Sequence, residues 1–196
     1  MKKYEFTGET KELFGGRYLH RIKALRDFGD VKTGELGGWI EEESNLEHMS
    51  NAWVGGNAVV SDDATVGGNA VVYGDAKVRG NAVVSDYATV GGNAWVSDDA
   101  TVGGNATVGG NAWVRGNAVV YGDADILWIS KIGSRNDTIT FVRSIDSTVL
   151  VTVGCFHGTI DEFEKKVLET HGDNEHAQAY RLAIQLAKLR IKVDKE

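Results

Sequence analysis

One six-residue unit repeats without interruption over residues 51–128, and it constrains the fold more than any other feature of the chain. Alanine occupies every sixth position in the range Ala52–Ala124, and valine does so in the range Val54–Val120, with Ile126 closing the series. Self-similarity at a short fixed period is typical of a solenoid, in which each repeat contacts only its neighbours. The sequence therefore predicts a stack of short strands joined by tight corners.

The repeat also predicts which side chains point into the solenoid. Alternation along a strand places the alanine and the valine of each unit on one side, and the residue between them on the other. Val54 is therefore expected to point inward, as is Ala58 after the corner Gly55-Gly56-Asn57. Glycine, asparagine and aspartate suit such corners because they adopt positive φ at low steric cost.

Read as Val-Gly-Gly-Asn-Ala-x, the unit resembles the hexapeptide repeat of left-handed parallel β-helices, in which an aliphatic residue is followed four positions later by a small one. The resemblance implies a triangular coil of three units, with eighteen residues per turn. Proteins of this class are commonly trimers, so it also implies a homo-oligomer, with a trimer favoured. The entry segment DFGDVKTGELGGWI and the C-terminal segments GSRNDTITF and CFHGTIDEFE resemble a group of bacterial and phage hexapeptide-repeat proteins without an assigned activity.

We expect three parts: an N-terminal β cap at 1–38, a β-helix solenoid at 39–128 and a C-terminal α/β module at 129–196. In the cap, short strands are expected with turns at Thr7-Gly8-Glu9 and Gly15-Gly16. Stepping back by six from Ala52 reaches Leu46 and Ile40, so degenerate repeats are expected to begin near Trp39. Terminal units of a solenoid are atypical because they protect an otherwise exposed edge.

The C-terminal part has the pattern of a small ββαα module that covers the last coil. Residues 137–143 and 148–153 alternate as two antiparallel strands joined by a turn. Thr159 and Glu162 form a capping box before a helix at about 160–170, and a second helix follows Asp173 or Asn174. The predicted fold class is therefore mainly β, a left-handed parallel β-helix with two end modules.

Composition excludes several classes of function. The net charge is −7, and the repeat itself carries eight aspartates and three basic residues, so no basic block suggests bulk binding of nucleic acid. The single cysteine excludes an intramolecular disulfide and fits a reducing compartment. No apolar run suits a signal peptide or a membrane span. We therefore expect a cytoplasmic protein that does not enter a membrane.

The outward positions of the repeat differ among the three faces of the coil. Residues eighteen apart stack, so the three basic residues of the repeat fall on one face, together with two tryptophans. Tryptophan and arginine are enriched where binding energy concentrates, and flat rings beside cations suit the base and phosphate of a nucleotide or an anionic protein surface. Alternatively, the tryptophans pack against another subunit, or they are plain exposed surface. The predicted binding residues, called here the tryptophan face, are Lys77, Arg79, Trp95, Trp113 and Arg115.

An acyl-CoA-dependent acyltransferase is one alternative, because many hexapeptide β-helices serve that chemistry. Those enzymes use a histidine as general base beside a loop that projects from a coil. This repeat has neither, and the nearest histidines are His48 and His157. The sequence therefore favours a protein that is not an enzyme, with no cofactor.

Cys155 and His157 form another candidate pair, because residues two apart on a strand share a face and a thiolate nucleophile needs a nearby base. His171, Asp173 and His176 lie further along. A metal site needs three or four ligands, and one cysteine with scattered histidines is a weak signal, so we predict no metal.

These observations favour a non-catalytic β-helical scaffold that binds through the tryptophan face or the C-terminal module. The phage-like layout makes a host protein or a nucleotide-like ligand the expected partner, and a phage or mobile element the expected source. A net charge of −5 over the repeat also raises an acidic mimic of nucleic acid. Mimicry needs regular rows of carboxylates, whereas these aspartates are spaced irregularly at corners.

Overall fold

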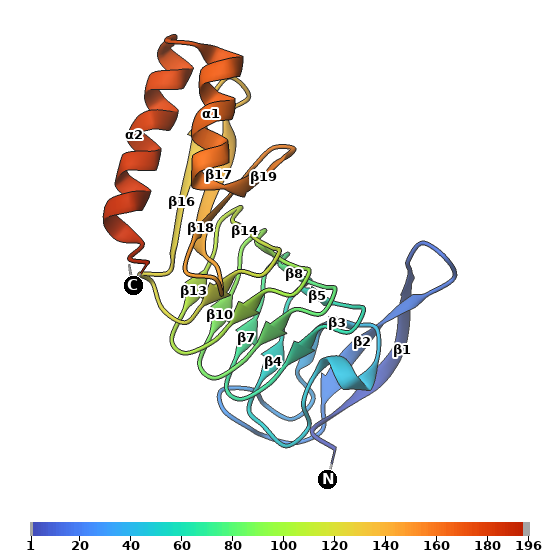
Figure 1. The fold of residues 1–196 in the computed structure, drawn as a ribbon. Helices are drawn as coiled ribbons and strands as arrows, with labels where there is room; N and C mark the ends of the chain where they lie inside the picture. Colours follow the sequence, from blue (N-terminus) through green and yellow to red (C-terminus); the bar gives the residue numbers. More distant parts are fainter. Residues whose placement is uncertain (1, 194–196) are drawn as a thin grey trace.

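The computed structural model describes residues 2–193, which form a parallel β-solenoid with a strand module at its N-terminal end and a sheet with two helices at its C-terminal end. The two ends of the chain lie at opposite ends of the solenoid (Figure 1). The predicted fold class is confirmed at this level, as mainly β with a solenoid and two small end modules.

Each coil of the solenoid contains three two-residue strands, and each strand pairs in parallel with the strand eighteen residues later, as Val54 pairs with Val72 and Val72 with Val90. The strands form three faces. The first comprises β5 (Val59–Val60), β8 (Lys77–Val78), β11 (Trp95–Val96) and β14 (Trp113–Val114); the second β4 (Trp53–Val54), β7 (Val71–Val72), β10 (Thr89–Val90) and β13 (Thr107–Val108); and the third β6 (Thr65–Val66), β9 (Val83–Val84), β12 (Thr101–Val102) and β15 (Val119–Val120).

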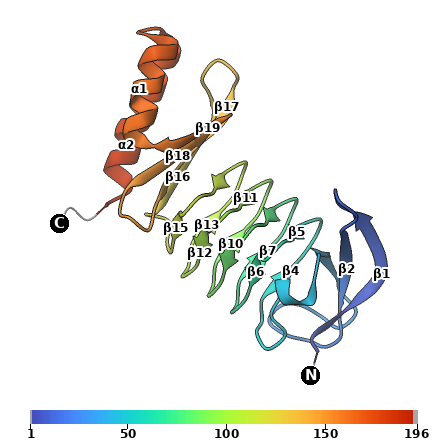
Figure 2. The same cartoon turned by 45° about the vertical axis from the view of Figure 1, so that its right-hand side comes forward.

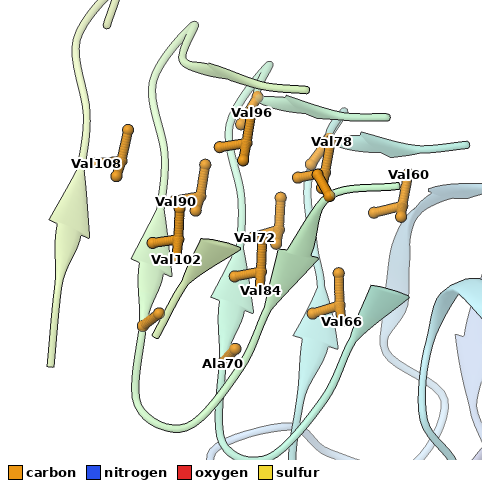
Figure 3. Packing of buried hydrophobic residues seen from close by; sticks show 14 of the residues in the cluster. Val60, Val66, Ala70, Val72, Val78, Val84, Val90, Val96, Val102 and Val108 are labelled. Atoms are coloured by element: carbon orange, nitrogen blue, oxygen red, sulfur yellow. The ribbon is translucent and has the colours of Figure 1, made fainter. Parts of the chain in front are cut away.

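The interior of the solenoid consists of the alanines and valines of the repeat. All of them in the ranges Ala52–Ala118 and Val54–Val120 are at most 1 % exposed. Valines of successive coils stack in columns (Figure 3). Each buried valine contributes about 2 kcal/mol relative to an exposed one. The inward positions predicted from the period are therefore confirmed.

The corners explain the spacing of glycine and aspartate in the repeat. From Gly56 to Gly116 the second corner residue has positive φ, and where it is not glycine it is aspartate, as at Asp62, Asp86 and Asp98 with φ of 57°, 57° and 61°. Each of these carboxylates accepts a hydrogen bond from a backbone N–H of the next coil, those of Gly80, Gly104 and Gly116, at 2.9–3.0 Å. These aspartates therefore join neighbouring coils.

The N-terminal module extends the first face of the solenoid. β1 (Tyr4–Glu12) and β2 (Tyr18–Ala24) form a hairpin, and β3 (Leu36–Ile40) joins that hairpin to β5. The hairpin projects beyond the first coil (Figure 2). Trp39 pairs with Val59, so the repeat begins near Trp39 as expected. The 3-10 helix η1 (Glu43–Asn45) follows.

Two details of this module differ from the sequence-based expectation. Gly8 lies at an irregularity within β1, where the register with β2 shifts between Phe6 and Thr10, and it does not end a strand. Ile40 and Leu46 lie opposite Val60 and Val66, at valine positions, although the period of six placed them at alanine positions. The coil widens here by two residues, which gives the larger side chains the room that an alanine position lacks.

The C-terminal module is an antiparallel sheet covered by two helices. Its strands are β16 (Ile126–Ile132), β17 (Asp137–Arg143), β18 (Val149–Val153) and β19 (Phe156–Thr159), followed by α1 (Ile160–His171) and α2 (Glu175–Arg190). The helices pack on one face of the sheet (Figures 1 and 2). The two predicted strands and both helices are present, including the Thr159 capping box, and β16 and β19 are additional.

This module closes the last coil, as expected. The Trp113 N–H donates to Thr140 Oγ1 at 3.0 Å, and the Ile145 N–H donates to the Asn117 carbonyl at 3.1 Å. Val142 and Leu150 belong to the solenoid core. The module therefore satisfies backbone groups that the last coil would otherwise expose. No helix within residues 2–193 is long and apolar enough to span a bilayer.

Candidate functional site

The structure brings the predicted tryptophan face together. Lys77, Trp95 and Trp113 occupy equivalent positions on β8, β11 and β14 and pair in register. The indole rings of Trp95 and Trp113 are stacked, with centroids 5.0 Å apart and planes inclined by 5°. Because neighbouring parallel strands lie about 4.8 Å apart, the rings stand upright on the sheet and stack along the solenoid axis.

The other side of Trp95 is covered by cations. Lys77 Nζ lies 4.7 Å from the centroid of the Trp95 ring, and Arg79 Cζ lies 4.5 Å from it. Both cations belong to the preceding coil, whereas Trp113 belongs to the next one. Trp95 therefore has no free face on which a base or sugar ring could stack, and Lys77 and Arg79 are engaged with it.

Arg115 lies at the corner of the last coil, below the C-terminal module. Its Nε is 3.7 Å from Asp98 Oδ2, and its side chain is 34 % exposed. Burial first, and the positive charge of Arg115 second, hold the pKa of His157 below its ordinary value. Arg115 thus belongs to the contact between coil and module as much as to the tryptophan face.

Trp113 is the one member of the stack that lines a cavity. A cleft of about 360 Å³ lies between the last coil and the turns of the C-terminal sheet. We call it the Trp113 cleft. It is lined by Asn111, Trp113, Asn136, Asp137, Thr138, Thr152, Val153 and Gly154.

The lining of the Trp113 cleft is polar, with one carboxylate and no cation. Asparagine amides and threonine hydroxyls both donate and accept hydrogen bonds, and the Asp137 carboxylate accepts them. Lys77 and Arg79 lie beyond Trp95, about 10 Å further along the axis at the usual strand spacing. The cleft therefore suits an uncharged ring with one apolar face and several hydroxyl or amide groups, and it offers no partner for a phosphate.

Apart from Trp113, sequence reasoning missed these lining residues. Asn111 was visible only as a corner residue. Asn136 and Gly154 lie in turns between strands, where both have positive φ, of 52° and 54°. Their only sequence signal is the turn chemistry itself, which does not show that the turns of the module hang over the last coil.

His48 has no lone pair to offer as a general base. It borders a groove of about 460 Å³ together with Glu43 and Glu47. However, the Lys3 N–H donates to His48 Nδ1 at 3.3 Å, which places the ring proton on Nε2, and Nε2 lies 3.7 Å from Glu43 Oε2. The ring also stacks on Tyr4 with centroids 4.2 Å apart. These contacts describe a packed histidine.

The other two catalytic candidates have different surroundings. Cys155 is exposed in the turn before β19, whereas His157 Nδ1 lies 3.1 Å from Thr152 Oγ1, and a Cβ added at Gly116 would lie 2.9 Å from His157 Nε2. Extended geometry begins only at Phe156, so the assumption that Cys155 and His157 share a strand is wrong. His157 therefore packs against the last coil.

The solenoid carries no projecting loop between residues 51 and 122, since each pair of strands there is joined by one short corner. Among residues 2–193, no group of three or more His, Cys, Asp and Glu side chains is placed to hold a metal ion. The sequence matches no protein-family model, and a search of curated proteins finds no match either.

Proposed function

We propose that this protein is a non-catalytic binding protein whose solenoid presents Trp113 to a small polar ring held in the Trp113 cleft. The observation that carries the proposal is that Trp113, whose ring is stacked on Trp95, lines a cavity of about 360 Å³ with several hydrogen-bonding side chains. A volume of this order suits a compact ligand such as a neutral sugar or a nucleoside. The expectation of a nucleotide-like ligand is thereby narrowed to one without phosphate.

The test is calorimetric titration of the protein with neutral mono- and disaccharides and with nucleosides. Loss of one ring-stacking contact costs about 1–3 kcal/mol, so Trp113→Ala should weaken binding by about tenfold or more. Thr107→Ala, at an outward position of another face of the last complete coil, is the matched control and should leave the affinity unchanged. Two results contradict the proposal: no heat with any ligand, or equal affinity in wild type and Trp113→Ala.

Self-association is a second proposal. Three leucines on the outer side of α2, Leu182, Leu186 and Leu189, are 66, 43 and 77 % exposed. On the basis of the resemblance to hexapeptide-repeat proteins, we propose that the coil is left-handed and that the assembly is a trimer. Light scattering measures the solution mass directly. If the trimer dissociates in Leu186→Lys, α2 forms the interface. If it persists, the solenoid forms the interface. A monomeric wild type contradicts the proposal.

Capture of a host protein, with a phage or mobile element as the source of the chain, is supported by the same leucines and by the layout of the C-terminal segments. The exposed stripe on α2 offers an apolar surface to a protein partner.

A further inference from the structure

A second cavity, of about 510 Å³, lies between the end of the C-terminal sheet and α1. None of the residues of the tryptophan face borders it, and it shares only Asp137 and Val153 with the lining of the Trp113 cleft. We call it the aromatic pocket. Nothing in the proposal for the Trp113 cleft depends on it.

Three aromatic side chains form its apolar wall. The Phe163 ring lies 5.1 Å from the Phe156 ring and 5.3 Å from the Tyr180 ring, centroid to centroid. Phe163 is buried at the centre of this group, and Phe156 is half-buried. The first pair is tilted by 48° and the second is edge-on at 85°, and all three residues line the pocket, so this wall favours an apolar, planar guest.

Two glycines lie in the turns around the pocket, Gly133 against the Tyr180 ring and Gly154 against Arg135. Gly133 has a φ of 72°, and a Cβ there would collide with the Tyr180 hydroxyl. Gly154 has a φ of 54°, and a Cβ there would lie 2.8 Å from Arg135 Nη2. The positive φ favours glycine at both positions, and at Gly133 the Tyr180 hydroxyl also leaves no space for a side chain.

The rim of the pocket carries more positive than negative charge. Arg135 and Lys166 border it, and Asp137 is the one carboxylate among its described lining residues. Arg135 forms no ion pair within residues 2–193, and Lys166 pairs with Glu169 at 3.4 Å on the exposed side of α1. Asp137 Oδ2 approaches the same Gly154 as Arg135 Nη2 but forms no ion pair with it, and a guanidinium placed in this way beside an aromatic wall is suited to an anionic group.

We propose that the aromatic pocket binds a small molecule with a planar apolar body and one anionic group, an aromatic carboxylate or sulfonate. The rings of Phe156, Phe163 and Tyr180 contact the body, and Arg135 and Lys166 receive the anion. The bound molecule covers Cys155, whose thiol is exposed at the rim and is the only cysteine of the chain.

The probe for the test is 8-anilinonaphthalene-1-sulfonate, an aromatic anion of suitable size. We expect saturable fluorescence enhancement with one site per chain, and slower alkylation of Cys155 by iodoacetamide when the probe is bound. Arg135→Gln and Lys166→Glu should each weaken binding severalfold, and together about tenfold or more. Benzoate and octanoate, as competitors, distinguish a preference for an aromatic from an aliphatic body.

Lys165→Glu is the matched control, because Lys165 is an exposed neighbour on α1 that does not border the pocket. It makes the same change in net charge and should leave binding unchanged. Trp113→Ala should also leave it unchanged, which separates this site from the Trp113 cleft. Equal binding in wild type and in Arg135→Gln/Lys166→Glu, or alkylation of Cys155 that the probe does not slow, would overturn the proposal.

Discussion

Lys3 shows how one residue can close an end of the solenoid. Its side chain is fully buried, and its ammonium donates hydrogen bonds to the carbonyls of Ala52 and Ser50 at 2.6 and 3.1 Å. It also lies 5.1 Å from the centroid of the Phe28 ring. Burial lowers the pKa of Lys3 from its ordinary value of 10.5 to about 8. The ammonium therefore satisfies carbonyls of the first coil at an electrostatic cost.

That pKa predicts how stability depends on pH. Between the folded pKa of about 8 and the ordinary value of 10.5, the unfolded chain binds a proton at Lys3 that the folded chain has released. The free energy of unfolding should therefore rise with pH over this window. Urea titrations between about pH 7 and about pH 9.5 should show this rise in wild type and a smaller one in Lys3→Met.

Tyr4 limits the pH range over which these titrations can be interpreted. Burial raises the pKa of its hydroxyl, so above the ordinary pKa of 10.0 the unfolded chain loses this proton before the folded chain does, and the free energy of unfolding falls. Groups that do not interact with Lys3 are common to both proteins, so their effects on stability cancel in the difference. The same slope in wild type and Lys3→Met would contradict the assignment.

For single residues, the sequence predicts which side chains stack above one another on the solenoid, but not how those side chains are oriented. The period of six placed Lys77, Trp95 and Trp113 one above another, and the structure confirms that stacking. It did not show that the Trp113 ring and the cations of Lys77 and Arg79 would cover the two faces of Trp95, or that Trp113 would line a cavity. Ring orientation depends on rotamers and on neighbours from the C-terminal module, which the repeat does not encode.

At the scale of the element, the corners permit a direct test. Asp86 combines a φ of 57° with a hydrogen bond from the Gly104 N–H to Oδ2 at 2.9 Å. Asp86→Ala keeps a Cβ in the left-handed region and removes the bond, so it should destabilise the protein by about 1–2 kcal/mol. Asp86→Gly loses the bond but relieves the backbone and should cost less. Urea unfolding midpoints measure both.

Asp63 is the control for that comparison, since it lies at an equivalent corner, is exposed and has no positive φ. Asp63→Ala should change stability by no more than about 0.5 kcal/mol. An equal loss in Asp63→Ala and Asp86→Ala would show that the corner aspartates do not join the coils.

Elements with strong periodicity were predictable, and short or irregular ones were not. β17, β18 and both helices follow their patterns and caps. β16 was missed because its first residues continue the repeat and Lys131, with a φ of 60°, interrupts its pairing with β17. β19 has only four residues, one of them Gly158, so it is too short to show a recognisable alternation of apolar and polar residues. Gly8 was assigned to a turn because an irregularity within a strand and a turn share the same residue type.

At the scale of the whole molecule, every coil presents the same alanines and valines to its neighbours. Deleting residues 81–86, one complete unit, joins two intact units and keeps valine above valine. We therefore expect this variant to fold, with a β-rich circular dichroism spectrum and one cooperative urea transition. Its C-terminal module should be turned by about a third of a turn relative to the N-terminal hairpin, since three units make a coil.

Deleting only residues 81–83 is the control. It places corner residues against the valines of the adjoining coil, and each buried polar group left unpaired costs about 1–3 kcal/mol. That variant should lose its cooperative transition. If both deletions behave alike, the stacking of equivalent units is not what holds the solenoid together.

The placement of the C-terminal module relative to the solenoid was the feature least predictable from the sequence. Closure of the last coil by the C-terminal module was expected from the need to protect an edge. The Trp113 cleft was not, because it joins the last coil to turns that follow it by more than twenty residues. Contacts of this kind depend on how the module is angled, and no local pattern in the chain specifies that angle.

The ladder that joins each residue to the one eighteen positions later also has a mechanical consequence. The hydrogen bonds between coils run along the axis, and the chain termini lie at opposite ends (Figure 1). A force applied to the two termini therefore pulls the terminal coil away from its neighbour and breaks the hydrogen bonds between them a few at a time. Stretched in this way, the protein should yield at low force in steps of about 60 Å, the extended length of one coil.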